Sequence, residues 1–487
     1  FETIPFVDII EYSKRYCEMD VEVLKQGYSK FNSLLEEGCD MSAYDYLSSA
    51  QMANEYMLKK GVYDKVKKLS STPRDYIMKC MVGGRTMLAN NKKSHHKGHI
   101  SDFDAVSLYP SAMKRLGGFL IGTPKVLEDL RYEFLKEQDG YFVQIKITKV
   151  GKEYAFPLMS QKGDTGNRDW TNNPTQNLHV DKFTLEDLIE FHQIEFEVID
   201  GYYYDEGRDD TLGPVIEYLF SQRLVLKKAG NPLQEIYKLI MNSSYGKCLQ
   251  KPITDKVNFV KNGDLDKFID KQYNRISGGY EKLYGGNEEY SIYRIKTEKG
   301  ICDHYNNAHC GIEVLSMSKR IMNEVMCLAE DIGVPVYYQD TDSLHTPTES
   351  IDKLAWEFGK KYNRDLIGSG MGQFHTDFSS SIIKDDIHAV ESIFLGKKCY
   401  IDKLSGLDAE GKVVYDYHIR MKGVSLPAIH YRAKELGCDV MDIYRRLYNG
   451  ESETFDLCCG GNKVCFERNS NFTIFTRQSF MRTLSFT

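Results

Sequence analysis

Apolar positions recur at helical spacing through residues 1–65, and this stretch is predicted to be helical. Within it, Tyr16 and Asp20 are four residues apart, so a helix places them on one face. Taken alone, the pattern is that of an amphipathic helix whose acidic face contacts water. This pattern predicts no catalytic or binding role for Tyr16 or Asp20.

A second helical pattern spans residues 211–249 and predicts a hairpin of two helices. The first is expected from Leu212 to about Lys228 and the second from Leu233 to about Cys248. The sequence Gly230-Asn231-Pro232 marks the break between them.

Three polar side chains share one face of the second helix of this hairpin. Lys238, Asn242 and Tyr245 follow one another at spacings of four and three residues. A lysine, an amide and an aromatic ring can bind triphosphate oxygens and support a base, and Arg223 of the first helix can face the same gap. The alternative is an amphipathic helix with a half-buried tyrosine.

Two short apolar runs each predict a strand that ends beside aspartates. The run 100–110 contains Asp104 near its end, and Pro110 stops the strand before a helix. The run that starts at Val334 enters a tight turn at Asp340-Thr341 and returns as a second strand.

The aspartates at these strand ends form a candidate metal site. Asp340 and Asp342 are two residues apart, so an extended chain points both the same way, and they repel each other unless a cation lies between them. Carboxylate ligands favour a hard ion such as Mg²⁺ or Mn²⁺. Asp104 can supply a third carboxylate and Ala105 a backbone carbonyl. The alternative is an acidic turn on the protein surface.

Two further segments are candidates for phosphate contact. Gly83-Gly84 permits close approach of the backbone to a ligand, and the adjacent Arg85 can grip a phosphate, although an ordinary turn explains the same residues. Lys398 and Tyr400 alternate to one side of a strand predicted at residues 396–401.

Histidine and cysteine clusters elsewhere lack the spacing of a metal site. Residues 90–99, with His95, His96 and His99, are predicted to form a solvated polar loop. The group Cys302, His304, His309 and Cys310 is interpreted as a helix start, and the group Cys458, Cys459 and Cys465 as a loop.

Composition limits the class of protein. A chain of 487 residues is too long for one compact core, so several subdomains are expected. A hydrophobic content of 41% excludes a disordered protein, and no apolar run has the length of a membrane span. The 12 cysteines are scattered, which suits a reducing compartment inside a cell. A net charge of −7 disfavours a protein that simply coats DNA, yet permits an enzyme with one basic groove.

The order of four motifs resembles that of family B DNA polymerases. The motifs are Asp104-x-x-Ser107-Leu108-Tyr109-Pro110, Lys238-x-x-x-Asn242-Ser243-x-Tyr245-Gly246, Tyr338-x-Asp340-Thr341-Asp342-Ser343 and Lys398-x-Tyr400. The resemblance covers roughly residues 75–425. It implies an α+β, right-hand polymerase fold, with a palm built on an antiparallel sheet, fingers formed by a helical hairpin, and a thumb.

The resemblance also implies an order of domains. They are the remnant of an exonuclease domain (1–65), palm (66–115), an insertion that contacts a priming protein (116–200), fingers (201–250), an insertion for processivity (251–300), palm (301–400), and thumb with C-terminal tail (401–487). The gaps between the motifs, with Gly83-Gly84, are similar to those of the protein-primed branch found in phages, adenoviruses, linear plasmids and mobile elements. Met81 departs from the aromatic residue that is common in that branch.

The N-terminal helical segment resembles the end of a 3′–5′ exonuclease domain. Tyr16 and Asp20 match its third motif, and its other acidic residues are expected upstream of Phe1. We therefore expect the chain to be a fragment or a processed product, and we expect that it does not proofread alone.

The implied reaction is attack of a primer 3′ hydroxyl on the α-phosphate of a dNTP, assisted by two Mg²⁺ ions, with Mn²⁺ as a substitute. Asp104 and Asp342 would bridge the ions together with the Ala105 carbonyl, and Asp340 would bind them directly or support them. The residues implied in dNTP binding are Ser107, Leu108, Tyr109, Arg223, Lys238, Asn242 and Tyr245. Those implied in binding DNA are Gly83, Gly84, Arg85, Gly246, Thr341, Ser343, Lys398 and Tyr400. The implied partners are template-primer DNA, dNTPs and a priming protein, and the chain is expected to be a monomer that does not bind membranes.

Other interpretations explain fewer residues. A family B polymerase primed by nucleic acid accounts for the motifs but not for the gaps. A reverse transcriptase lacks the Lys238 pattern, and a glycosyltransferase with a D-x-D site accounts only for Asp340 and Asp342. An inactive DNA-binding module derived from a polymerase leaves the three aspartates and Lys238 unexplained.

Overall fold

The computed structural model describes residues 8–162, 168–175, 177–251, 253–284, 291–300, 306–461, 463–467, 473–477 and 480–486. Its central feature is an eight-stranded antiparallel sheet with the order β1-β14-β15-β2-β17-β18-β19, in which β16 also pairs with β2. The strands are β1 (Thr86–Leu88), β2 (Ser94–Ala105), β14 (Tyr338–Asp340), β15 (Ser343–Pro347), β16 (Phe374–Thr376), β17 (Asp385–Gly396), β18 (Cys399–Leu407) and β19 (Val413–Met421). This sheet corresponds to the predicted palm.

The sheet corrects two boundaries predicted from sequence. Residues 94–99 are not a loop but the first half of β2, because β17 pairs with them and places Ile393 opposite His95. Likewise, β18 and β19 pair along their whole lengths, so the sheet continues to Met421. The predicted start of a separate C-terminal region at residue 401 is therefore too early.

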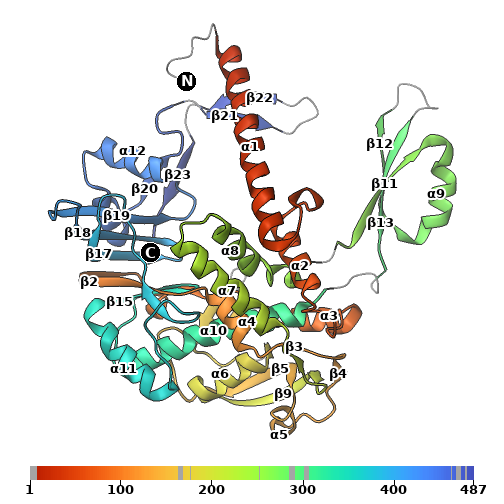
Figure 1. The fold of residues 1–487 in the computed structure, drawn as a ribbon, viewed down its shortest axis with the longest axis horizontal. Helices are drawn as coiled ribbons and strands as arrows, with labels where there is room; N and C mark the ends of the chain where they lie inside the picture. The colour runs from red at the N-terminus through yellow and green to blue at the C-terminus, as the bar shows by residue number, and fades with distance from the viewer. Residues whose placement is uncertain are drawn as a thin grey trace.

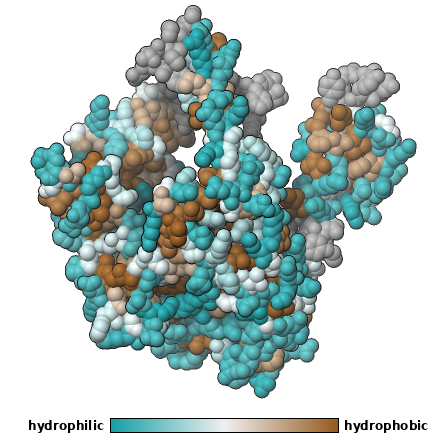
Figure 2. Space-filling view, in the orientation of Figure 1, coloured by the Kyte–Doolittle hydropathy of each residue, from teal (hydrophilic) through white to brown (hydrophobic). Residues whose placement is uncertain are grey.

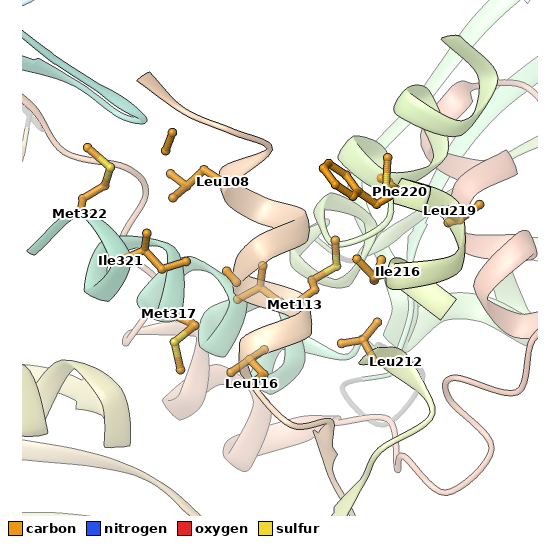
Figure 3. Packing of buried hydrophobic residues seen from close by; sticks show 14 of the residues in the cluster. Leu108, Met113, Leu116, Leu212, Ile216, Leu219, Phe220, Met317, Ile321 and Met322 are labelled. Atoms are coloured by element: carbon orange, nitrogen blue, oxygen red, sulfur yellow. The ribbon is translucent and has the colours of Figure 1, made fainter. Parts of the chain in front are cut away.

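Helices pack beneath the sheet around one hydrophobic core. They are α4 (Leu108–Arg115), α7 (Leu212–Lys228), α8 (Leu233–Ser243), α10 (Ala308–Asp331) and α11 (Ile351–Tyr362). Figure 3 shows α4 lying between α7 and α10, with Leu108, Met113 and Leu116 facing Leu212, Ile216, Leu219 and Phe220 on one side and Met317, Ile321 and Met322 on the other. Because α4 begins directly after Asp104, this packing fixes the helical hairpin relative to the end of β2.

The hairpin itself closely follows its prediction. Helix α7 has the expected bounds, and α8 begins at Leu233 as expected. Helix α8 ends at Ser243, however, so Tyr245 lies beyond it, before the 3₁₀ helix η3 (Gly246–Leu249).

The N-terminal region is helical, as predicted. It consists of α1 (Ile9–Cys39), η1 (Ala43–Asp45), α2 (Ser49–Lys59) and α3 (Ser71–Met78). The Asp8 side chain caps α1 by accepting bonds from the amides of Ile10 and Glu11. Only the C-terminal part of α1 contributes buried residues, including Leu34 and Leu35, and the rest projects from the body (Figure 1).

Two smaller sheets interrupt the body at the places predicted for insertions. The first has the order β4-β9-β5-β8 and is covered by α6 (Lys182–His192). Its strands are β4 (Lys125–Val126), β5 (Gly140–Lys149), β8 (Leu178–Asp181) and β9 (Glu195–Tyr204); around it lie β3 (Phe119–Leu120), α5 (Tyr132–Leu135), β6 (Met159–Lys162), β7 (Arg168–Thr171) and β10 (Arg208–Asp209).

The second small sheet stands apart from the body (Figure 1). It contains β11 (Asp255–Lys261), β12 (Ile276–Tyr284) and β13 (Ile292–Glu298) with α9 (Leu265–Gln272), and 3₁₀ turns flank that helix. Figure 2 shows hydrophobic side chains gathered on it, and Val257, Phe259 and Tyr280 are exposed there.

The elements of the C-terminal region are α12 (Leu426–Leu436), α13 (Val440–Tyr448), β20 (Glu453–Asp456), β21 (Lys463–Glu467), β22 (Thr473–Arg477) and β23 (Met481–Leu484). Helices α12 and α13 and strand β20 pack against the end of the main sheet. Among the helices that the structure describes, none is both long and apolar enough to span a bilayer.

Candidate active site

The pairing of β2 with β15 brings the first and third motifs together. Asp104 lies opposite Ser343 in the ladder, and the amide of Ala105 donates a hydrogen bond of 2.9 Å to the carbonyl of Asp342. The Asp104 and Asp342 carboxylates consequently line one cavity, as the motif order predicts.

The turn between β14 and β15 holds an unusual backbone conformation. The amide of Asp342 donates to the carbonyl of Asp340 at 2.8 Å, and Thr341 between them has a φ of 65°. A β-branched residue rarely adopts this left-handed conformation, so the surroundings must stabilise it. Gly84 packs against the turn so closely that an added Cβ would lie 2.6 Å from the Thr341 Cγ2 atom.

Arg85 supports this turn and is not placed to bind DNA. Its side chain is 2% exposed, and the guanidinium donates to the side chain of Gln339 and to the carbonyls of Phe156 and Pro157. Burial lowers the pKa of Arg85 to about 10. The predicted phosphate contact of Arg85 is therefore wrong, because the side chain points into the protein behind the turn.

The cavity beside Asp104 and Asp342 has a volume of about 920 Å³. The hairpin contributes three basic residues to the lining of the same cavity, Arg223, Lys227 and Lys238. The remaining predicted nucleotide-binding residues also line it: Ser107, Leu108, Tyr109, Asn242 and Tyr245. The structure thus gathers all seven residues assigned to dNTP binding around one space.

Aromatic and polar contacts order the floor of this cavity. The rings of Tyr109 and Tyr245 stack with centroids 4.5 Å apart. Arg223 donates to the hydroxyl of Ser107 at 3.3 Å, which links α7 to the start of α4. Ser107 has a φ of 50° and precedes the first turn of that helix.

The electrostatics of the acidic residues favour a cation. Burial, together with the charges of Asp342, Asp377 and Asp102, raises the pKa of Asp104 to about 8. The pKa of Asp342 is also raised, chiefly by burial. A divalent cation would relieve this mutual repulsion, and two carboxylates with the nearby Ala105 carbonyl are hard oxygen donors suited to Mg²⁺ or Mn²⁺.

Asp340 lies in a different environment from Asp104. Its carboxylate accepts a hydrogen bond from Thr86 at 3.0 Å and pairs with the Lys398 ammonium at 2.8 Å. It lines a second cavity of about 450 Å³, whereas Asp342 lines both cavities. The geometry favours an indirect role for Asp340 over direct ligation beside Asp104.

The remaining residues assigned to DNA binding differ in accessibility. Lys398 is exposed in the turn between β17 and β18, while Tyr400 is 4% exposed and packs against Tyr338 and Phe394. Ser343 is also buried. Lys398 and Tyr400 nevertheless both line the cavity of about 450 Å³, and their contact with DNA stays a prediction.

Sequence reasoning missed an acidic residue near the cavity. Asp377 follows the short strand β16, and its amide donates to the carbonyl of Asp102 at 2.9 Å. It lines both cavities together with Asp342. The sequence before this strand, Gly368-Ser369-Gly370-Met371-Gly372, was a signal that could have drawn attention to the segment. Alternating glycines indicate a backbone that packs closely against its neighbours.

Other candidates lie away from this site. Tyr16 and Asp20 are exposed on the projecting part of α1. His309 is buried and stacks on Tyr204, whereas Cys302 and His304 lie outside the described residues. Cys458 and Cys459 occupy a turn, and the side chain of Cys465 is likewise outside the description.

Comparison with known proteins assigns the chain to a protein family. The family described as DNA polymerase type B, organellar and viral, matches residues 5–328. A DNA polymerase of Kluyveromyces lactis is 22% identical over 447 residues, which are 84% of this chain and 42% of that protein. A probable DNA polymerase of Ascobolus immersus is 24% identical, over 80% of this chain and 29% of its own length. The chain thus spans less than half the length of these relatives.

The fold agrees with the family assignment. Phi29 DNA polymerase, solved with primer-template DNA and incoming nucleotide substrates, superimposes with a TM-score of 0.59 at 14% identity, over 91% of this chain and 68% of that one. This likeness confirms the predicted α+β polymerase fold. Since the family match covers well over half of the sequence, the chain belongs to the type B DNA polymerases of the organellar and viral kind.

Proposed function

We propose that the chain is a DNA-directed DNA polymerase that adds dNTPs to a primer 3′ hydroxyl. The observation that carries the proposal is the cavity of about 920 Å³, to which the main sheet contributes Asp104 and Asp342 and the helical hairpin contributes Arg223 and Lys238. Such a space combines residues that bind cations with residues that attract a triphosphate. The Phi29 complex with primer-template and nucleotides, whose fold this chain shares, supports the same substrates.

The reaction assigns complementary tasks to the acidic and the basic residues. The primer oxygen forms a bond to the α-phosphorus while the bond to the bridging oxygen breaks and pyrophosphate leaves. Asp104 and Asp342 would hold two Mg²⁺ ions, which supply activation of the attacking oxygen and charge neutralisation at the leaving group. Lys238 and Arg223 would bind the β- and γ-phosphates, whose negative charge grows as the bond breaks.

The stacked tyrosines would define the nucleotide pocket in this cavity. Tyr109 lines the cavity next to Asp104 in the first motif, where it would pack under the sugar and exclude a 2′ hydroxyl. Tyr245, stacked on it, would contact the nascent base pair. Lys398, exposed and already paired with a carboxylate, would exchange that partner for a primer phosphate, a contact that carries no sequence information.

We also propose that replication is primed by a protein. The two small sheets at residues 116–204 and 251–300 support this, because they occupy the gaps that resemble the protein-primed branch. The alternative, priming by nucleic acid, uses the same active site. Ten cysteines in the described part of the chain are free thiols. Free thiols support action in a reducing compartment.

Primer extension tests the polymerase proposal. With Mg²⁺, dNTPs and a templated duplex, the chain should extend the primer, and Asp104→Ala should abolish extension. Asp386→Asn is the matched control, because the Asp386 side chain is exposed and pairs with His388. Extension retained by Asp104→Ala would refute the assignment.

A parallel reaction tests protein priming. It contains the candidate priming protein and labelled dNTP but no nucleic-acid primer. Covalent labelling of that protein supports the proposal, whereas primer extension without labelling favours priming by nucleic acid.

A further inference from the structure

Three side chains from separate strands converge behind the active-site turn. They are His345 of β15, Asp402 of β18 and His418 of β19. One ligand atom from each lies within 4.8 Å of the other two. The Asp402 Oδ2 atom is 3.3 Å from the Nε2 atom of His345 and 3.0 Å from the Nδ1 atom of His418.

The 3.3 Å separation of His345 and Asp402 fits two ligands that share an ion, whereas the 3.0 Å separation of His418 and Asp402 is also that of a hydrogen bond. Bonds of about 2.0–2.1 Å in a tetrahedral site place neighbouring ligand atoms about 3.3–3.4 Å apart. A direct bond between an imidazolium and a carboxylate is shorter, about 2.7–2.9 Å. The separation between His345 and Asp402 is therefore long for a charged hydrogen bond and suits two ligands of one metal.

The groups behind the ligands have the arrangement that metal sites use. The His345 Nδ1 atom faces the Asp102 Oδ1 atom at 3.8 Å, and among the described residues neither buried atom has a hydrogen-bond partner. Binding of an ion to Nε2 places the proton of the ring on Nδ1, where it can be donated to Asp102 after a small shift. Ser392 donates to the other oxygen of Asp402 at 2.6 Å and orients that carboxylate.

Charge balance also favours a divalent ion. Asp402 is 0% exposed and Asp102 is largely buried, so two carboxylates lie in a region of low dielectric constant. One divalent cation bound to neutral imidazoles cancels both charges. Without it, the compensating charge must come from protonated histidines or from Arg420, which lines the adjoining cavity.

The cluster is accessible from one side. His418 is half-buried and lines the cavity of about 450 Å³ together with Asp102 and Tyr400. An ion can enter there, and a water molecule can complete the coordination sphere from that side. Two nitrogens and one carboxylate select a borderline ion such as Zn²⁺ over Mg²⁺.

We propose that His345, Asp402 and His418 form a transition-metal site, with Zn²⁺ as the expected ion and Asp102 as the acceptor that orients His345. The ion joins β15 to β18 and β19. In the sheet order, β2 and β17 lie between β15 and β18. Strand β15 follows Asp342, and β18 follows Lys398. The site thus clamps the acidic turn to the hairpin that carries Lys398, and it is distinct from the polymerase metals.

Metal binding by the full chain tests the proposal without reference to polymerase activity. The double variant Asp104→Ala/Asp342→Ala removes the other candidate cation site. After chelation and dialysis, it should bind one equivalent of Zn²⁺ by elemental analysis, and Co²⁺ should give the visible absorption of a tetrahedral nitrogen and oxygen site. Zn²⁺ should also raise the Tm of the unmodified chain.

Variants locate the ion. In that background, His418→Gln should weaken Co²⁺ binding by more than about 100-fold, and Asp102→Asn by about 10- to 100-fold. His388→Gln is the control, because His388 stacks on His99 away from the cluster. His418 is partly exposed, so its replacement is compatible with folding, and the Tm test needs no variant. Absence of binding by the chelated protein, or binding unaffected by His418→Gln, would overturn the proposal.

Discussion

The backbone amide of Thr341 donates a hydrogen bond of 2.9 Å to the carbonyl of Arg85. This bond joins the segment before β1 to the turn between Asp340 and Asp342. Arg85 also bonds through its side chain to Gln339, so one residue holds the turn from two directions. The segment containing the paired glycines therefore acts as a support for the turn.

The two glycines should respond differently to substitution. A Cβ at Gly84 would lie 2.6 Å from Thr341, whereas a Cβ at Gly83 would meet no atom within 4 Å. Gly84→Ala should lower the free energy of unfolding by about 1–3 kcal/mol and reduce kcat, because the turn must move. Gly83→Ala is the matched control and should leave the free energy of unfolding unchanged. Denaturant unfolding and single-nucleotide incorporation measure both effects, and equal behaviour of the two variants would refute the packing role.

Arg85→Met should destabilise the protein without altering its electrostatic contact with DNA. The substitution leaves the Gln339 side chain and two carbonyls without their donor, which should cost about 2–4 kcal/mol in urea unfolding. The slope of log Kd for DNA against log salt concentration should stay unchanged. Lys398→Ala should reduce that slope by about one phosphate contact. A reduced slope for Arg85→Met would show instead that Arg85 contacts a DNA phosphate.

Asp340 and Asp342 should differ in their importance for turnover. Asp342 lines the cavity with Asp104, while Asp340 is neutralised by Lys398 and faces the smaller cavity. Asp342→Asn should lower kcat by at least about 10²–10³-fold, and Asp340→Asn by about tenfold or less. Rapid-quench incorporation measures this, with thermal unfolding as a check on folding. Equal losses would show that Asp340 is also a direct metal ligand.

The Mg²⁺ concentration that primer extension requires should fall as the pH rises. Since the pKa of Asp104 is raised to about 8 by burial and neighbouring carboxylates, a proton competes with the cation at neutral pH. The Mg²⁺ concentration for half-maximal extension should therefore decrease between about pH 6.5 and 8.5. Asp377→Asn removes one charge that raises this pKa and should move the profile to lower pH, by less than about one unit because Asp377 is exposed.

The control for this profile is Asp386→Asn, whose carboxylate lies on the surface. It should leave the dependence of extension on Mg²⁺ and pH unchanged. A profile that does not move in Asp377→Asn would show that the charge of Asp377 does not contribute to the raised pKa of Asp104.

Lys238 should contribute more to nucleotide binding than Lys228 at the end of α7. Lys238→Ala removes a positive charge from the cavity wall and should raise the dNTP KM or lower kcat by about 10- to 100-fold. Lys228→Ala removes an equal charge from an exposed residue that does not line the cavity. Steady-state kinetics compare them, and similar values for both variants would contradict a specific phosphate contact.

Local patterns in the sequence determined much of this protein. Helical periodicity and the Gly230-Asn231-Pro232 break located the hairpin, because these features act within a few residues. The ordered motifs identified Asp104, Asp342 and Lys238, and the structure brings all three to one cavity.

Only the tertiary structure decided which neighbours these residues have. The burial of Arg85, the pairing of Asp340 with Lys398 and the approach of Asp377 all join segments distant in sequence. The same is true of β2, whose polar first half is a strand because β17 hydrogen-bonds to it. Periodicity reports the environment along one element, whereas strand pairing and side-chain burial depend on which other elements fold against it.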